Sequence, residues 1–142
     1  MNDKQVYLIL FASWIVATIS TLGSLFFSEV MGFIPCTLCW YERICMYPLV
    51  VILFTGLIKF DRSVFRYVLP LTAFGWVISL YHNLVQLEVI PESASPCVRG
   101  IPCSMKYINW FGFITIPLLA FIAFTLLLIF IYLFYRRSSD AK

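Results

Sequence analysis

The chain has 142 residues, of which 62% are hydrophobic and 12% are charged, and its formal net charge is +3. Soluble domains are usually about half apolar and about one quarter charged, so this composition excludes a soluble domain of useful size. The positive charge is small and dispersed, which argues against a nucleic-acid partner.

The first predicted helix spans residues 6–27. This apolar run is longer than the hydrophobic core of a signal peptide, which has about 7–15 residues, and no clear cleavage site follows it. At a rise of about 1.5 Å per residue, the run is long enough to cross a hydrocarbon core of about 30 Å. We therefore expect an uncleaved membrane helix.

Three further apolar runs are predicted to cross the bilayer. They span residues 39–58, 67–87 and 110–135. The one long segment outside them, residues 88–108, contains three prolines and a glycine, which favour an irregular loop. The sequence therefore predicts an all-α membrane protein. We expect a four-helix transmembrane bundle with one longer extracytoplasmic loop, forming a single integral membrane domain over residues 1–142.

The basic residues predict how the bundle is oriented. Seven of the ten lie on the side of the two termini, namely Lys4, Lys59, Arg62, Arg66, Arg136, Arg137 and Lys142. Arg43, Arg99 and Lys106 lie on the other side. Because cytoplasmic flanks carry the excess of lysine and arginine, we expect both termini in the cytoplasm.

Cys36 and Cys39 form a C-x-x-C pair where the second helix begins. They are one helical turn apart, and Arg43 lies one turn below Cys39. The positive helix terminus and the guanidinium both favour a thiolate at Cys39. The pair is typical of a redox motif or of half a zinc site. Arg43 is either a residue of the site or an anchor whose charged head reaches the membrane interface. Glu42 points elsewhere, and we expect an interfacial role for it.

Cys97 and Cys103 are predicted to close a short, proline-rich loop with a disulfide. Such a bond is either a structural staple or, if strained and exposed, a labile oxidant. The C-x-x-C pair on the same outer face favours thiol–disulfide exchange between the two pairs, in an oxidising compartment. The fifth cysteine, Cys45, lies inside an apolar run, where we expect a small buried hydrophobe.

His82 and Gln86 lie four residues apart, on one face of the third helix near its outer end. One interpretation is a polar pair satisfied by interhelical hydrogen bonds. The other is a pair of donors to a carbonyl-bearing ligand between the helices. A histidine there is also suited to handle the protons that a two-electron quinone reduction consumes.

The segment CTLCWYER, residues 36–43, resembles the signature of the DsbB family of quinone-linked, disulfide-generating membrane proteins. Residues 33–36 (FIPC), 96–103 (PCVRGIPC) and 107–115 (YINWFGFIT) are similar to the short BdbC-type members. The likeness runs from the first helix to the fourth, and this combination of motifs is very specific. It implies a multi-pass protein of the bacterial cell membrane.

The resemblance also implies a relay. A reduced, extracytoplasmic thioredoxin-like oxidant is expected to bond to Cys97, after which Cys103 exchanges with Cys36. Cys39 is then left as a thiolate beside a membrane quinone, either menaquinone or ubiquinone. Arg43, His82 and Gln86 match the residues expected around that quinone. The second cysteine pair is far more widely spaced in the larger enterobacterial proteins.

Three alternatives remain at this point. The first is a thiol enzyme that exchanges electrons with a quinone in the style of vitamin K epoxide reductase. The second is a structural four-helix membrane protein whose disulfides only stabilise its outer loops. The third is a zinc site made by four cysteines, which the wide spacing of the loop pair and the oxidising side disfavour. We therefore expect no metal site.

Overall fold

The computed structural model describes residues 2–140, which fold into four long helices. These are α1 (Asp3–Leu25), α2 (Thr37–Lys59), α3 (Val64–Gln86) and α4 (Ile116–Asp140). A π-helical turn, η1 (Phe26–Val30), extends α1. All four spans are long and apolar enough to cross a membrane, and the described residues form no β-strand. The predicted all-α, four-helix membrane protein is confirmed.

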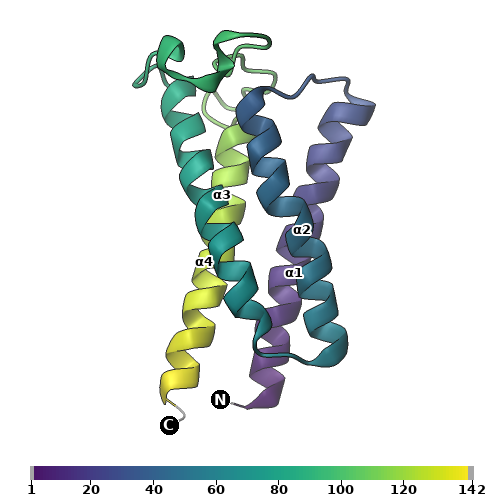
Figure 1. The fold of residues 1–142 in the computed structure, drawn as a ribbon. Coiled ribbons are helices and arrows are strands. Elements are labelled where there is room, and N and C mark those ends of the chain that lie inside the picture. The colour runs from purple at the N-terminus through teal and green to yellow at the C-terminus, as the bar shows by residue number, and fades with distance from the viewer. Residues whose placement is uncertain (1, 141–142) are drawn as a thin grey trace.

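The helices form an up-and-down bundle in which each helix packs against two others. α1 packs on α2, α2 on α3, α3 on α4, and α4 back on α1 (Figure 1). The two termini lie at one end, whereas the long loop and the start of α2 lie at the other (Figure 1). The loop contains two short 3₁₀ turns, η2 (Glu92–Ala94) and η3 (Pro96–Val98). Both cysteine pairs therefore share one end of the bundle. Lys142, which contributed to the predicted orientation, lies outside the described residues.

The start of the fourth helix differs from the prediction. We expected it at residue 110, but α4 begins at Ile116. The residues before it form a tight turn, in which Trp110 and Ile114 exchange backbone hydrogen bonds of 3.0 and 2.9 Å. Phe111 and Gly112 have positive φ angles of 53° and 82°, which a helix does not accommodate. The predicted loop of residues 88–108 therefore extends to residue 115.

The interior of the bundle is packed by aromatic and aliphatic side chains. Near the termini, Phe65 and Phe134 stack with ring centroids 4.2 Å apart. Nearer the middle of α3 and α4, the fully buried ring of Phe124 lies against Gly75 of α3. A Cβ atom at Gly75 would lie only 2.2 Å from that ring. The absence of a side chain at Gly75 thus permits the close approach of α3 and α4, as small residues do in membrane bundles.

We predict that Gly75→Ala destabilises the bundle by about 1–3 kcal/mol, because the added methyl group overpacks a site with no free space. The midpoint of thermal unfolding in detergent measures the effect. Gly23→Ala is the matched control, since nothing lies within 4 Å of a Cβ atom at Gly23. Equal midpoints for Gly75→Ala and the parent protein would contradict this account of α3–α4 packing.

Candidate active site

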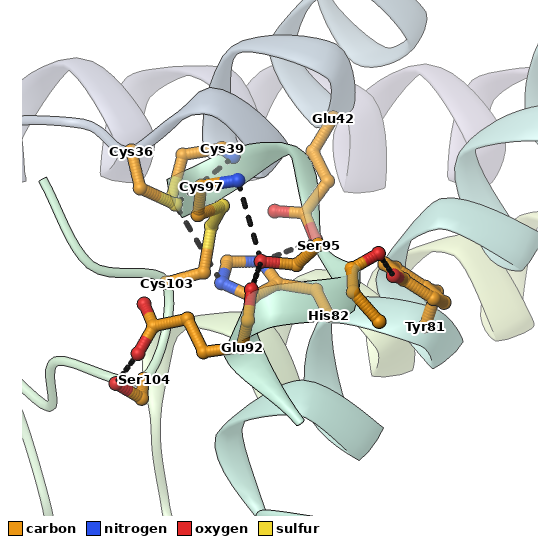
Figure 2. Close-up of a disulfide and its surroundings, with 11 residues drawn as sticks. Cys36, Cys39, Glu42, Tyr81, His82, Glu92, Ser95, Cys97, Cys103 and Ser104 are labelled. Carbon is orange, nitrogen blue, oxygen red and sulfur yellow. Dashed lines mark hydrogen bonds and ion pairs between the residues drawn. A yellow bond between two sulfur atoms is a disulfide. The ribbon is translucent and has the colours of Figure 1, made fainter. Parts of the chain in front are cut away.

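The C-x-x-C pair lies at the N-terminus of α2. Cys36 is the N-cap residue, and its sulfur accepts a hydrogen bond from the backbone N–H of Cys39 at 3.4 Å. The two sulfur atoms are 3.1 Å apart and are free thiols (Figure 2). Cys36 is buried, whereas Cys39 is half-buried. The predicted one-turn spacing therefore brings the two sulfurs into direct contact.

The loop pair, Cys97 and Cys103, is joined by a disulfide. The Ser95 hydroxyl accepts the Cys97 backbone N–H at 3.3 Å and donates to the Glu92 carbonyl at 2.7 Å. The Ser104 hydroxyl donates to the Glu92 carboxylate at 2.7 Å (Figure 2). The two cysteines are only 2% and 1% exposed. The predicted Cys97–Cys103 disulfide is thus present, and it is held inside an ordered loop rather than exposed.

Cys36 is the point where the two pairs meet. Its sulfur and those of Cys97 and Cys103 all lie within 4.8 Å of one another. The sequence predicted exchange between the pairs, and the fold brings them close enough for a sulfur of one pair to attack the other. Because Cys36 also touches Cys39, it is the bridging member of the four.

His82 and Glu42 continue this arrangement into the bundle. His82 Nε2 is 3.7 Å from the Cys36 sulfur, and Nδ1 is 3.1 Å from a Glu42 carboxylate oxygen (Figure 2). His82 is 2% exposed and Glu42 is 6% exposed. The interfacial role expected for Glu42 is therefore wrong. At about 100° per residue, Glu42 and Arg43 lie on opposite sides of Cys39 when the helix is viewed along its axis. The three-residue spacing from Cys39 to Glu42 places Glu42 near the thiols, and the sequence analysis did not use it.

The surroundings of Cys36 favour its thiolate. The contact with Cys39 lowers the pKa of Cys36 to about 4, and His82 contributes to the lowering while burial opposes it. Since an ordinary thiol has a pKa near 8.5, these contacts favour the thiolate form of reduced Cys36 at neutral pH. The thiolate that the sequence predicts at Cys39 stays a prediction, because no contact joins Arg43 to that sulfur among the described interactions.

A cavity of about 360 Å³ opens on the other side of Cys39, between α1, α2 and α4. Its walls are mostly apolar, but Arg43 and Tyr47 form a polar corner with Ser24 of α1. Arg43 donates to the Ser24 carbonyl at 3.2 Å, and the Tyr47 hydroxyl donates to the Ser24 hydroxyl at 3.1 Å. Arg43 also lies over the Trp40 ring, 5.2 Å from its centroid. The sequence analysis missed Tyr47, although it lies one turn below Arg43, and Ser24, for which the sequence carries no signal.

His82 and Gln86 line a different cavity, of about 20 Å³, together with Cys36, Cys39 and Cys103. Both side chains are buried. The three residues predicted around a cofactor are therefore divided. Arg43 faces the large cavity, His82 and Gln86 face the small one, and Cys39 borders both.

Comparison with known proteins places the chain in a family. The family model described as "Disulfide bond formation protein DsbB" matches residues 4–134. The chain belongs to the DsbB family. It is 53% identical to disulfide bond formation protein C of Bacillus subtilis over 99% of this chain and 100% of that protein. It is 48% identical to a probable disulfide formation protein C of Halalkalibacterium halodurans, over 89% and 93% of the two chains.

A third relative, a probable disulfide formation protein of Metapseudomonas resinovorans, is 41% identical over 92% of both chains. No solved structure matches the chain. Membership of this family, together with four membrane-crossing helices, makes the chain a multi-pass membrane protein and a disulfide-generating oxidoreductase. The resemblance stated from the sequence motifs is confirmed.

The site geometry predicts that Cys36 and Cys103 will form a disulfide when their usual partners are removed. In the double variant Cys39→Ser, Cys97→Ser, mild oxidation should join them, since their sulfurs lie within 4.8 Å. The bond is measured by mass spectrometry after alkylation, in which Cys36 and Cys103 of one chain remain unalkylated if they are joined.

The control for this trapping experiment is the triple variant Cys36→Ser, Cys39→Ser, Cys97→Ser. It retains Cys103 and the buried Cys45, which belong to different clusters of the interior, and it should stay fully alkylated. If Cys36 and Cys103 are also fully alkylated in the double variant, the two cysteine pairs do not meet as described.

Proposed function

We propose that this DsbB-family protein is a membrane thiol oxidase that reoxidises an extracytoplasmic, thioredoxin-like disulfide oxidant and passes the electrons to a membrane quinone. The observation that carries the proposal is the position of Cys36. Its sulfur lies between the loop disulfide and the thiol of Cys39, which borders an apolar cavity among the membrane helices. Electrons from an aqueous thiol can thus reach an apolar acceptor through successive sulfur–sulfur contacts.

The proposed relay is a series of thiol–disulfide exchanges. A partner thiolate attacks Cys97 and breaks the Cys97–Cys103 bond, and the second partner thiol then releases the oxidised partner. The freed Cys103 thiolate attacks Cys36 of a Cys36–Cys39 disulfide, which leaves Cys39 as a thiolate. The Cys97 thiolate then attacks Cys103 of the Cys103–Cys36 disulfide, which re-forms the loop bond and frees the Cys36 thiolate. Cys36 and Cys39 close their disulfide again as the pair gives up two electrons to the acceptor. Each cycle makes one partner disulfide, and the two electrons and two protons of the partner thiols pass to the acceptor.

The large cavity fits a quinone. Ligand sites for small organic molecules are usually apolar, of about 300–1,000 Å³, with a few polar groups that orient the ligand. The cavity of about 360 Å³ has this character, with Arg43, Tyr47 and Ser24 at its polar corner and Cys39 at its edge. A bound quinone accepts two electrons and two protons. Arg43 would hold one of its carbonyl oxygens, and the aliphatic and aromatic walls would exclude water.

His82 is proposed to act on the thiols. Its Nε2 faces the Cys36 sulfur, and the Glu42 carboxylate fixes its other ring nitrogen. This order of nucleophile, imidazole and carboxylate is the arrangement in which a histidine accepts a proton from a nucleophile. His82 would therefore take the Cys36 proton when the pair is reduced, which keeps Cys36 a thiolate that can re-form its bond with Cys39. Gln86 lines the same small cavity.

The proposed orientation places both cysteine pairs outside the cytoplasmic membrane. The fold places the pairs at one end and both termini at the other (Figure 1), and the excess of basic residues at the terminal end supports a cytoplasmic location for that end. Cys97 is 2% exposed. The partner must therefore move the loop aside before its thiolate reaches Cys97, which makes docking a prerequisite for attack.

Two cysteine variants test the relay. In detergent, with a reduced thioredoxin-like protein as the donor, we expect that Cys39→Ser abolishes the reduction of a short-chain quinone. Cys97→Ser should fail with the protein donor but still reduce quinone after a small dithiol has reduced Cys36 and Cys39. Quinone absorbance measures both results, and Cys45→Ser is the control that should match the parent. Parent-rate turnover of the protein donor by Cys97→Ser would show that the relay is wrong.

Arg43→Ala tests the proposed quinone cavity. A hydrogen bond to a charged group contributes about 1.5–3 kcal/mol, so the KM for quinone should rise at least about tenfold. The thiols should still form a disulfide with a chemical oxidant. Arg66→Ala, which removes an exposed arginine at the other end of the bundle, is the charge-matched control. An unchanged quinone dependence in Arg43→Ala would make Arg43 an anchor rather than a ligand.

A further inference from the structure

We propose that Cys36, Cys39 and His82 form, in the dithiol state only, an inhibitory binding site for a thiophilic divalent cation such as Zn²⁺ or Cd²⁺. The site is distinct from the four-cysteine zinc site considered from the sequence, since the loop sulfurs are engaged in a disulfide. It is not a resident cofactor site. The cation would enter only when the C-x-x-C pair is reduced.

The three side chains have the spacing of metal ligands. The Cys36 sulfur, the Cys39 sulfur and a His82 ring nitrogen all lie within 4.8 Å of one another. In a tetrahedral zinc site, with bonds of about 2.3 Å to sulfur and about 2.0–2.1 Å to nitrogen, neighbouring ligand atoms are roughly 3.5–3.8 Å apart. The distance of 3.7 Å between Cys36 Sγ and His82 Nε2 already fits. Cys39 Sγ, now 3.1 Å from Cys36 Sγ, needs to move by less than about 1 Å.

The three ligands border one small cavity. Cys36, Cys39 and His82 all line the small cavity of about 20 Å³. A cavity of about 10–15 Å³, measured by the space for a water-sized probe, is enough for one water molecule, so a single ion has room. Cys39 is half-buried and also borders the large cavity, which supplies a route to the site.

Glu42 prepares His82 for this role. Histidines that bind metals commonly donate their other ring N–H to a carboxylate, which fixes the tautomer and the ring orientation. The Glu42 carboxylate lies 3.1 Å from Nδ1, which leaves Nε2 with its lone pair directed to the Cys36 side. Both side chains are buried, so the imidazole is held in place before any ion arrives.

The charges also favour a divalent cation. Two thiolates in contact repel each other, and burial beside a carboxylate makes the repulsion costly. A divalent cation offsets the two negative charges and displaces two thiol protons, with no electron transfer. A Cys36–Cys39 disulfide offers no thiolate ligand, so oxidation of the pair removes the site. While bound, the ion would prevent the pair from closing its disulfide and would stop turnover.

The test is cadmium binding by equilibrium dialysis in detergent, with the full chain in a Cys97→Ser, Cys103→Ser background that removes the loop thiols. The reduced protein should bind one equivalent of Cd²⁺ and show thiolate-to-cadmium absorption. The same protein with Cys36 and Cys39 oxidised should bind none. Because the assay contains neither quinone nor partner, its result is separate from that of the oxidase proposal.

Three further variants complete this test. His82→Ala and Cys39→Ser should each weaken cadmium binding at least about tenfold, and Glu42→Gln should weaken it about 10–100-fold, as loss of an orienting carboxylate does. Cys45→Ser, which removes a buried thiol outside the site, should bind as its background does. The proposal would be overturned by the absence of cadmium binding, by binding that survives oxidation of the pair, or by His82→Ala and Cys39→Ser variants that bind cadmium as tightly as their background.

Discussion

The contacts of the Cys36 sulfur hold together the end of the bundle that carries the long loop. This sulfur accepts the Cys39 N–H that starts α2, faces His82 of α3, and lies within 4.8 Å of both loop sulfurs. Helix start, helix interior and loop thus meet at one atom. A disulfide relay needs such an atom, because a sulfur can exchange only with sulfurs that it can touch. The ordered loop, in which Cys97 and Cys103 are buried, holds the Cys97–Cys103 disulfide close to the Cys36 sulfur.

The bilayer explains the arrangement of the charged residues around this contact. Ionisable groups inside a membrane protein require partners within the protein. Glu42 and Arg43 are adjacent in α2 but find different partners, since Glu42 pairs with His82 and Arg43 with the carbonyl of Ser24. Glu42 and Arg43 also both line the large cavity, whereas His82 lines the small one. Cys39 borders both cavities, which is the position that the proposed transfer of electrons from thiol to quinone requires.

The sequence predicted what depends on long runs and local spacing, and it failed where tertiary contacts decide. Four apolar runs were sufficient to predict the helices, and the C-x-x-C spacing was sufficient to predict that Cys36 and Cys39 touch. The late start of α4 was missed because residues 110–115 are apolar yet form a turn closed by backbone hydrogen bonds. Glu42 was assigned to the interface because its partner lies 40 residues away. The separation of Arg43 from His82 likewise depends on how α1 and α3 pack on either side of α2.

The most direct measurement follows the loop disulfide in Cys36→Ser. The fully reduced protein would be mixed with a short-chain quinone, and alkylation with mass mapping would report when Cys97 and Cys103 re-form their bond. A Cys36→Ser, Cys39→Ser variant gives the uncatalysed background. If Cys36 is the junction, the parent protein closes the loop disulfide, whereas Cys36→Ser closes it no faster than the background. Closure of the loop in Cys36→Ser at the parent rate would show that electrons bypass Cys36 and would contradict the account.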